Sequence, residues 1–163
     1  MARVAIVMGS DHDLPVVEKA ISCLKDLKVE YEVRVISAHR SPEACAFFSR
    51  SAEENGFGAI IAAAGKAAHL AGAIAANTVL PVIGIPVKSS TLDGLDALLS
   101  TVQMPSGMPV ATVAIDGAEN AAILAAQILA NGDPELRARL KEKRRKALQA
   151  IEEVDKRVNE QFK

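Results

Sequence analysis

The segment Ala59-Ile60-Ile61-Ala62-Ala63 contains no polar side chain, and Ala64-Gly65-Lys66 follows it at once. A short apolar run that is closed by a glycine and a lysine is typical of a strand buried on both faces. Such strands belong to parallel sheets, whose connections cross the faces as helices. The segment therefore predicts an α/β protein built on a central parallel sheet.

On both sides of this segment, short apolar runs alternate with stretches of helical periodicity. The predicted strands are Val4–Met8, Tyr31–Ile36, Ala59–Ala63, Pro81–Pro86 and Val110–Ile115. The predicted helices begin near Pro15 and at Ser41-Pro42, and then cover Ala67–Asn77, Asp93–Val102 and Ala118–Leu129. This alternation predicts right-handed strand–helix–strand units that form one domain over residues 1–133.

The composition changes at Pro134, and ten of the 19 Lys and Arg residues lie beyond it. Acidic residues are interspersed among them, and apolar residues recur along one side, at Leu136, Leu140, Ala147, Leu148, Ile151, Val154 and Val158. Residues 134–163 are therefore predicted to form one long amphipathic helix of the same domain. One small domain can hardly cover so long an apolar seam, so we expect its far end to pack on a neighbouring subunit; the alternative is a solvated, frayed end.

The 163 residues are 50% hydrophobic, which indicates one folded domain rather than a disordered chain. The net charge is -1 and aromatic residues make up only 3%, so we expect neither nucleic acid nor membrane as a partner. The N-terminal residues lead directly into a strand, which suggests a cytoplasmic protein. Cys23 and Cys45 are predicted to be buried thiols, and the absence of a CxxC motif or Cys/His cluster argues against a metal site.

In parallel α/β sheets, ligands bind beyond the carboxyl ends of the strands, so the residues that follow each strand are the first candidates. Gly9-Ser10-Asp11-His12-Asp13 follows the first strand. The glycine allows a tight turn, Ser10 supplies a hydroxyl, and the next helix offers free N–H groups, a combination that suits phosphate. Asp13 either caps that helix or accepts hydrogen bonds from ribose hydroxyls.

Ser37-Ala38-His39-Arg40 follows the second strand. A guanidinium group binds phosphate with two parallel hydrogen bonds, and an imidazole transfers protons near neutral pH. Arg40 is therefore the predicted phosphate ligand of this loop, and His39 is the predicted proton-transfer residue.

Gly65-Lys66-Ala67-Ala68-His69-Leu70 follows the third strand, and its small residues would let backbone amides approach a ligand closely. His69 either orients this loop or meets the ligand. Lys66 is either a partner for a carboxylate or a solvated surface charge.

The turn-rich segment Gln103–Pro109 either simply joins a helix to the fifth strand or covers a pocket, its own or a neighbour's. Together, the loops predict a site for a small phosphorylated ligand.

These segments jointly resemble the class I N5-carboxyaminoimidazole ribonucleotide mutases of bacterial purine synthesis, the PurE family. The resemblance rests on Met8-Gly9-Ser10 with Asp13, Ser37-Ala38-His39-Arg40-Ser41-Pro42, Ala64-Gly65 with Ala67-Ala68-His69-Leu70, Leu80-Pro81-Val82-Ile83-Gly84, Gln103-Met104-Pro105, and Pro109-Val110-Ala111-Thr112 with Asn120-Ala121. It covers the chain from about Val4 to Leu129.

The resemblance implies a flavodoxin-like three-layer fold, a homo-octamer and a small ribonucleotide substrate, with no metal or organic cofactor. The implied reaction moves a carboxylate from the exocyclic nitrogen of an aminoimidazole to ring carbon C4. The residue that the resemblance marks as the acid–base catalyst is His39. Substrate-binding roles are implied for Ser10, Asp13, Ser37, Arg40, Gly65, Ala68, His69 and Leu70.

Three positions depart from the family pattern: His12 replaces a common Ser, Lys66 a common Gly, and Ala71 a common Pro. The nearest alternative is an aminoimidazole ribonucleotide carboxylase that takes CO2 directly. A non-catalytic flavodoxin-like module and a paralogue with a changed substrate are further alternatives.

Overall fold

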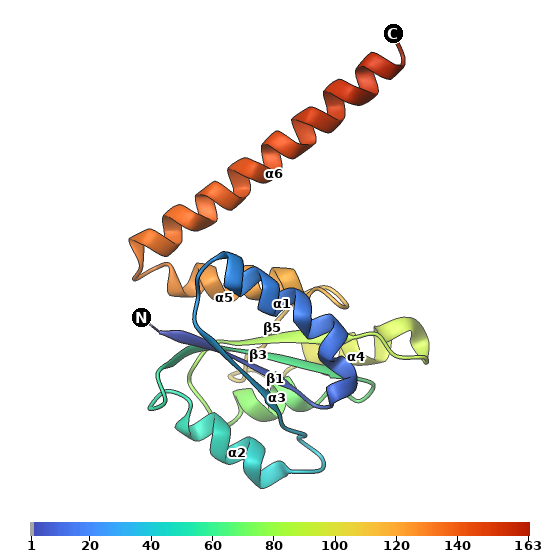
Figure 1. Ribbon diagram of the computed structural model, residues 1–163. Helices are drawn as coiled ribbons and strands as arrows, with labels where there is room; N and C mark the ends of the chain where they lie inside the picture. Colours follow the sequence, from blue (N-terminus) through green and yellow to red (C-terminus); the bar gives the residue numbers. More distant parts are fainter. Residues whose placement is uncertain (1) are drawn as a thin grey trace.

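The computed structural model describes residues 2–163, which form a five-stranded parallel sheet in the order β2-β1-β3-β4-β5 (Figure 1). The strands pair in register, so that Ile6 lies opposite Val33 on one side and Ile61 on the other, and Ile61 lies opposite Ile83. This is the strand order of flavodoxin-like domains. The predicted fold class is confirmed.

Strands and helices alternate along the chain, as the apolar periodicity predicted. The strands are β1 (Arg3–Met8), β2 (Tyr31–Val35), β3 (Phe57–Gly65), β4 (Val82–Val87) and β5 (Ala111–Thr112). The helices are α1 (Leu14–Asp26), α2 (Pro42–Ser51), α3 (Leu70–Ala75), α4 (Leu95–Val102), α5 (Ala118–Leu129) and α6 (Pro134–Gln161). Short helical turns, η1 (Asp11–Asp13) and η2 (Leu92–Gly94), precede α1 and α4.

Helices cover both faces of the sheet (Figure 1). On one face, α1 and α5 pack over the side chains of Ile6, Ile61 and Ile83. On the other face, α2 and α3 pack over Val7 and Ile60. Because both faces are covered, β1, β3 and β4 are buried almost throughout, and apart from Arg3 at the start of β1 their sequences are continuously apolar. This packed core fixes the carboxyl ends of the strands, where the site lies.

The predicted fifth strand was too long. β5 pairs with β4 only over Ala111–Thr112 rather than over Val110–Ile115. The N–H of Val113 still donates to the carbonyl of Gly84 at 3.1 Å, and that of Asp116 to the carbonyl of Pro86 at 2.9 Å. The two donors are three residues apart and the two acceptors only two, so the regular ladder is interrupted between them. An edge strand has only one neighbour, so its ladder ends as soon as the two backbones diverge.

Two predicted helices begin later than the sequence suggested. α3 starts at Leu70 rather than Ala67, because the residues before Leu70 form a tight turn in which the N–H of His69 donates to the carbonyl of Ala67 at 2.9 Å. α4 starts at Leu95 rather than Asp93, because Asp93 and Gly94 have φ values of 51° and 92°. A right-handed helix cannot continue through such residues.

The long C-terminal helix is present, as predicted. Its start is fixed by the Asp133 carboxylate, which accepts a hydrogen bond from the N–H of Leu136 at 2.9 Å. The first turns dock on the domain, where Arg139 Nε donates to the carbonyl of Leu27 at 2.7 Å and Lys143 pairs with Glu119 at 2.9 Å. Beyond these contacts, α6 projects away from the domain (Figure 1). Within residues 2–163, no helix combines the length and apolarity needed to cross a bilayer.

Candidate active site

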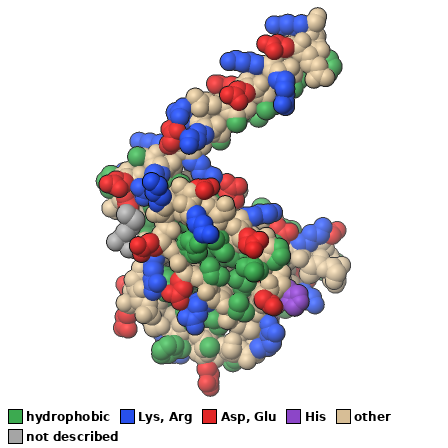
Figure 2. All heavy atoms as spheres, in the orientation of Figure 1, with side chains coloured by type: hydrophobic (Ala, Val, Ile, Leu, Met, Phe, Trp, Pro, Cys, Tyr) green, Lys and Arg blue, Asp and Glu red, His purple; other side chains and the backbone are tan. Residues whose placement is uncertain are grey.

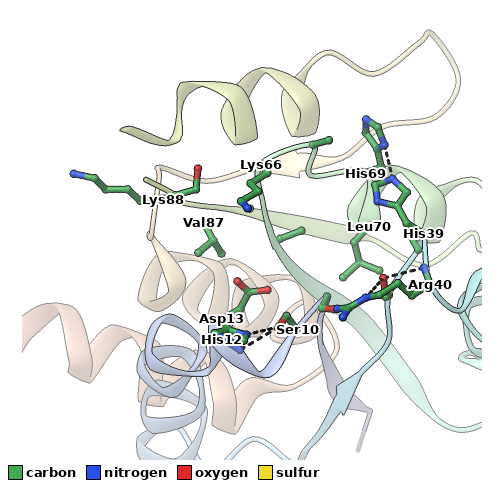
Figure 3. A pocket seen from close by; sticks show the side chains of 17 residues that line it. Ser10, His12, Asp13, His39, Arg40, Lys66, His69, Leu70, Val87 and Lys88 are labelled. Carbon is green, nitrogen blue, oxygen red and sulfur yellow. Dashed lines mark hydrogen bonds between the residues drawn. The ribbon is translucent and has the colours of Figure 1, made fainter. Parts of the chain in front are cut away.

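The carboxyl ends of β1 to β4 surround a cavity of about 740 Å³ (Figure 3). Eight of the nine predicted site residues line it: Ser10, Asp13, Ser37, His39, Arg40, Gly65, His69 and Leu70. Ala68 is the exception, because its side chain is turned into the protein and is buried. Three loops far apart in the sequence therefore meet in one place, as expected for the carboxyl edge of a parallel sheet.

The first loop presents a hydroxyl and an imidazole to the cavity. The Ser10 hydroxyl accepts a hydrogen bond from the backbone N–H of His12 at 3.3 Å and lies 2.9 Å from Nδ1 of the His12 ring. It also donates to the carboxylate of Asp11 at 3.1 Å. His12, which departs from the family pattern, thus adds a second hydrogen-bonding side chain beside Ser10.

Asp13 does not cap α1 by a hydrogen bond, although it occupies the position before the helix. Its carboxylate points into the cavity instead (Figure 3). Partial burial raises the pKa of the Asp13 carboxyl group above its ordinary value, and a backbone hydrogen bond at Ser10 opposes that shift only in part. An acceptor that is removed from water without a capping bond is available to ligand hydroxyls.

The second loop is closed by two serines. Ser41 Oγ accepts a hydrogen bond from the N–H of Ser37 at 3.1 Å and donates to the Ser37 carbonyl at 2.9 Å. The Arg40 side chain reaches across to the first loop, where Nη2 donates to the carbonyl of Gly9 at 2.8 Å and Nε donates to Ser37 Oγ at 3.4 Å. Three of the five guanidinium N–H donors have no hydrogen-bond partner within residues 2–163 and remain for a ligand.

The imidazoles of His39 and His69 form a direct pair at the cavity (Figure 3). Nε2 of His39 lies 2.7 Å from Nδ1 of His69, and the rings stand edge to face at 88° with centroids 4.9 Å apart. At that distance, one nitrogen donates a proton and the other accepts it. The pair joins the second loop to the third and fixes the orientation of both rings.

The third loop has an unusual backbone. Gly65 lies so close to β4 that a Cβ atom there would stand 3.1 Å from the carbonyl oxygen of Val87. Lys66, the next residue, lines the cavity with a φ of 56°, a conformation that costs a non-glycine residue about 1–2 kcal/mol. Ala71, another departure from the family pattern, is buried and does not line the cavity.

The end of β4 and the loop after it also contribute to the cavity. Val87, Lys88 and Ser89 line it, and Lys88 Nζ pairs with Asp93 at 3.1 Å. Their place directly after a strand made them candidates from the sequence, but no residue among them was assigned a role. The segment Gln103–Pro109 does not line this cavity; Gly107, Met108 and Pro109 border a separate groove.

The cysteines lie away from this chemistry. Cys23 and Cys45 are free and buried, as predicted, and burial raises the pKa of both thiols. Among residues 2–163, no group of three or more His, Cys, Asp or Glu side chains is placed to hold a metal ion.

Comparison with known proteins identifies the family. The AIR carboxylase family model matches residues 3–150. The chain is 58% identical to the N5-carboxyaminoimidazole ribonucleotide mutase of Pyrococcus abyssi over 144 residues, which is 88% of this chain and 83% of that protein. It is 55% identical to the mutase of Escherichia coli K12 over 146 residues, 88% of this chain and 86% of that one.

Two further comparisons bear on activity and fold. The phosphoribosylaminoimidazole carboxylase of Ogataea methanolica is 56% identical over 131 residues, which cover 80% of this chain but only 24% of that protein. The crystal structure of Treponema denticola PurE superposes with a TM-score of 0.89 at 32% identity, covering 96% of this chain and 98% of that one. The chain belongs to the AIR carboxylase family.

Proposed function

We propose that the protein is an N5-carboxyaminoimidazole ribonucleotide mutase of purine biosynthesis. It would be an isomerase that converts this substrate to 4-carboxy-5-aminoimidazole ribonucleotide. The observation that carries the proposal is the hydrogen-bonded His39–His69 pair on the same cavity as the partly free guanidinium of Arg40. The same cavity thus holds a group that can transfer a proton and a group that can bind phosphate. Curated relatives over 50% identical that bear the mutase name support this proposal.

The nucleotide would be held by the first two loops. Arg40 and Ser10 lie next to each other across the Gly9 carbonyl and offer N–H and O–H donors for phosphate. The Asp13 carboxylate, which makes no cap hydrogen bond, would accept hydrogen bonds from ribose hydroxyls. Ser37 would support Arg40 through its hydroxyl.

The reaction would proceed through CO2 within the cavity. The bond between the exocyclic nitrogen and the carboxylate carbon breaks, its electron pair stays on nitrogen, and His39 gives that nitrogen a proton. Carbon C4 then attacks the trapped CO2 and becomes tetrahedral, still bearing its hydrogen. His39 removes that proton from C4 and so returns to its starting protonation state, and the imidazole ring of the substrate recovers its aromaticity. Holding CO2 beside C4 supplies much of the acceleration.

His69 would position the catalytic ring, because its hydrogen bond of 2.7 Å constrains the orientation of His39. Gly65 and Leu70 would enclose the migrating carboxylate together with His69. Ala68 would act only by packing the loop in place, since its side chain is buried.

We also propose a homo-octamer in the cytoplasm, in which α6 packs on a neighbouring subunit. Figure 2 shows hydrophobic side chains along one edge of the projecting helix, with basic and acidic groups over much of the remainder. The exposed apolar residues of this seam are Leu148, Ile151, Val154 and Val158. Residues 1–133 would then form the catalytic domain, and residues 134–163 its helix of assembly.

The decisive experiment is a direct assay of two reactions. Purified protein is given N5-carboxyaminoimidazole ribonucleotide, or aminoimidazole ribonucleotide with CO2, and the C4-carboxylated product is followed. A mutase forms product rapidly from the first substrate and far more slowly from the second. The reverse ratio would identify a carboxylase, the name borne by the Ogataea methanolica relative. Binding without product from either substrate would identify a non-catalytic module.

A further inference from the structure

The cavity contains a lysine that the proposed reaction has not yet used. Lys66 follows Gly65, the last residue of β3, and its side chain is directed into the cavity, towards the side where Val87 and Asp13 lie (Figure 3). Its φ of 56° is a strained conformation for a residue with a side chain. Strain of this kind persists where the surrounding structure imposes it, and it concentrates at functional sites.

Lys66 differs from the other cations on the cavity in having no partner in the described part of the chain, residues 2–163. Arg40 is held by the carbonyl of Gly9, and Lys88 is paired with Asp93 at 3.1 Å. The ammonium group of Lys66 makes neither a hydrogen bond nor an ion pair with any residue in the range 2–163. A charge placed at a ligand cavity without an internal counter-ion is available to an anionic ligand.

We propose that Lys66 binds the migrating carboxylate of the substrate and product. This inference rests on the proposed function and extends it, because it assigns that group a counter-ion specific to this chain. The phosphate has its own ligands, since Arg40 and Ser10 lie together at the first loop. Lys66 instead follows Gly65 on the loop that carries His69, and His69 is hydrogen-bonded to His39, the group that would transfer the proton.

A lysine suits an anion that changes position. The carboxylate leaves the exocyclic nitrogen and is re-formed on C4, so its counter-ion must reach both places. The ammonium group is a point charge with rotatable donors on a flexible four-carbon stem, whereas a guanidinium fork favours one fixed geometry. Lys66 attracts the carboxylates at both ends of the reaction more strongly than it attracts neutral CO2. It therefore acts on the affinity for carboxylated ligands more than on the chemical step.

The test compares two ligands that differ by one carboxylate. Calorimetry measures the Kd of 4-carboxy-5-aminoimidazole ribonucleotide and of aminoimidazole ribonucleotide for wild type, Lys66→Gln, Lys66→Gly and Lys66→Arg. Lys66→Gln removes the charge and keeps a side chain on the strained backbone, while Lys66→Gly removes both. We expect about a tenfold loss of affinity for the carboxylated ligand in both neutral variants, as for the loss of a charged hydrogen bond. Affinity for aminoimidazole ribonucleotide should change less than twofold, and Lys66→Arg should retain most of the carboxylate preference.

Lys88→Gln is the matched control, because it removes a cavity lysine that is already paired with Asp93. It should leave the ratio of the two affinities unchanged. An equal loss for both ligands in Lys66→Gln would place Lys66 on the phosphate or ribose, and no loss for either would make it a solvated charge. Either result overturns the inference while the proposed function stands. Wild-type protein that binds neither ligand would instead contradict the proposed function itself.

Discussion

The His39 ring is exposed at the cavity rather than packed in the core, so replacing it should change chemistry without changing the fold. We expect His39→Asn to keep the wild-type free energy of unfolding to within about 0.5 kcal/mol. Turnover of N5-carboxyaminoimidazole ribonucleotide should fall by about 10²- to 10⁴-fold, the usual contribution of a general acid–base group. Steady-state kinetics and nucleotide binding by calorimetry measure the two effects separately.

His12→Asn makes the same chemical change at another histidine of the cavity. The His12 ring is hydrogen-bonded to Ser10 and not to the His39–His69 pair. Its loss should therefore weaken nucleotide binding a few-fold and leave the turnover rate unchanged. Near-normal turnover in His39→Asn would refute the role given to His39.

The Asp13 carboxylate should lower the stability of the folded protein at neutral pH while it strengthens ribonucleotide binding. Burial raises the pKa of this carboxyl group, so between the ordinary value of 3.8 and the raised value the folded protein binds more protons than the unfolded chain. The contribution of Asp13 to stability therefore falls as the pH rises through that window. We expect Asp13→Asn to be more stable than wild type at pH 7, with a difference that shrinks towards pH 4, and to bind the ribonucleotide more weakly. Urea unfolding across this pH range measures the difference.

Asp11 provides a control of opposite sign two residues away. A hydrogen bond from Ser10 and the proximity of His12 lower the pKa of the Asp11 carboxyl group. Its contribution to stability is present above pH 3.8 and is lost as the pH falls through its lowered pKa. Asp11→Asn should therefore not gain stability at pH 7. A gain in Asp11→Asn as large as that in Asp13→Asn would disprove the burial argument.

Among the elements, β4 depends on a glycine for its packing. A Cβ atom at Gly84 would collide with the buried side chain of Thr101 on α4 and lie 3.4 Å from Cβ of Ala71 on α3. We expect Gly84→Ala to lower the free energy of unfolding by about 1–3 kcal/mol, the usual cost of overpacking a core. Gly132→Ala is the control, because nothing lies within 4 Å of its added Cβ. Equal urea midpoints for the two variants would contradict this account of the helix packing on β4.

The central elements could be predicted from sequence because one physical signal dominates each of them. Ala118–Leu129 is apolar with helical spacing, and the predicted and observed bounds of α5 agree. Val110–Ile115 is equally apolar, yet β5 is short, because strand length depends on where the neighbouring backbone lies. The start of α3 could not be predicted either, since alanine-rich sequence favours a helix while residues 67–69 form a turn at the edge of the cavity.

The candidate site could be predicted to the level of loops but not of contacts. Because ligands bind at the carboxyl ends of parallel strands, Ser10, Arg40 and His69 were predicted to share one site, and all three line the same cavity. The hydrogen bond between His39 and His69 joins residues 30 positions apart, and only the folded geometry of two loops reveals it. The left-handed backbone of Lys66 is likewise seen only in the structure, although the glycine common at this position in the family was a signal for it.

At the scale of the whole molecule, the projecting helix α6 has an apolar seam that nothing in the single chain covers within residues 2–163. Within this range, Leu136 is the only buried side chain of α6, and no hydrogen bond or ion pair joins the helix to the domain beyond Lys143. Ile151 remains 62% exposed, although it lies on the same side of the helix as Val154 and Val158. Long helices that leave an apolar seam in water commonly bury it against another subunit.

The seam can be tested with two substitutions that add the same charge. Ile151→Glu places a carboxylate in the seam, whereas Gln149→Glu places one on the opposite side of α6, two residues or about 200° away. Because Ile151 is exposed in the single chain, Ile151→Glu should fold normally, but an unpaired charge in a subunit contact costs several kcal/mol. In sedimentation velocity, wild type and Gln149→Glu should therefore run as one large assembly, and Ile151→Glu should shift towards smaller species. A wild-type protein that sediments as a monomer would refute the proposed packing of α6, and an Ile151→Glu assembly of unchanged size would show that the contact lies elsewhere on the molecule.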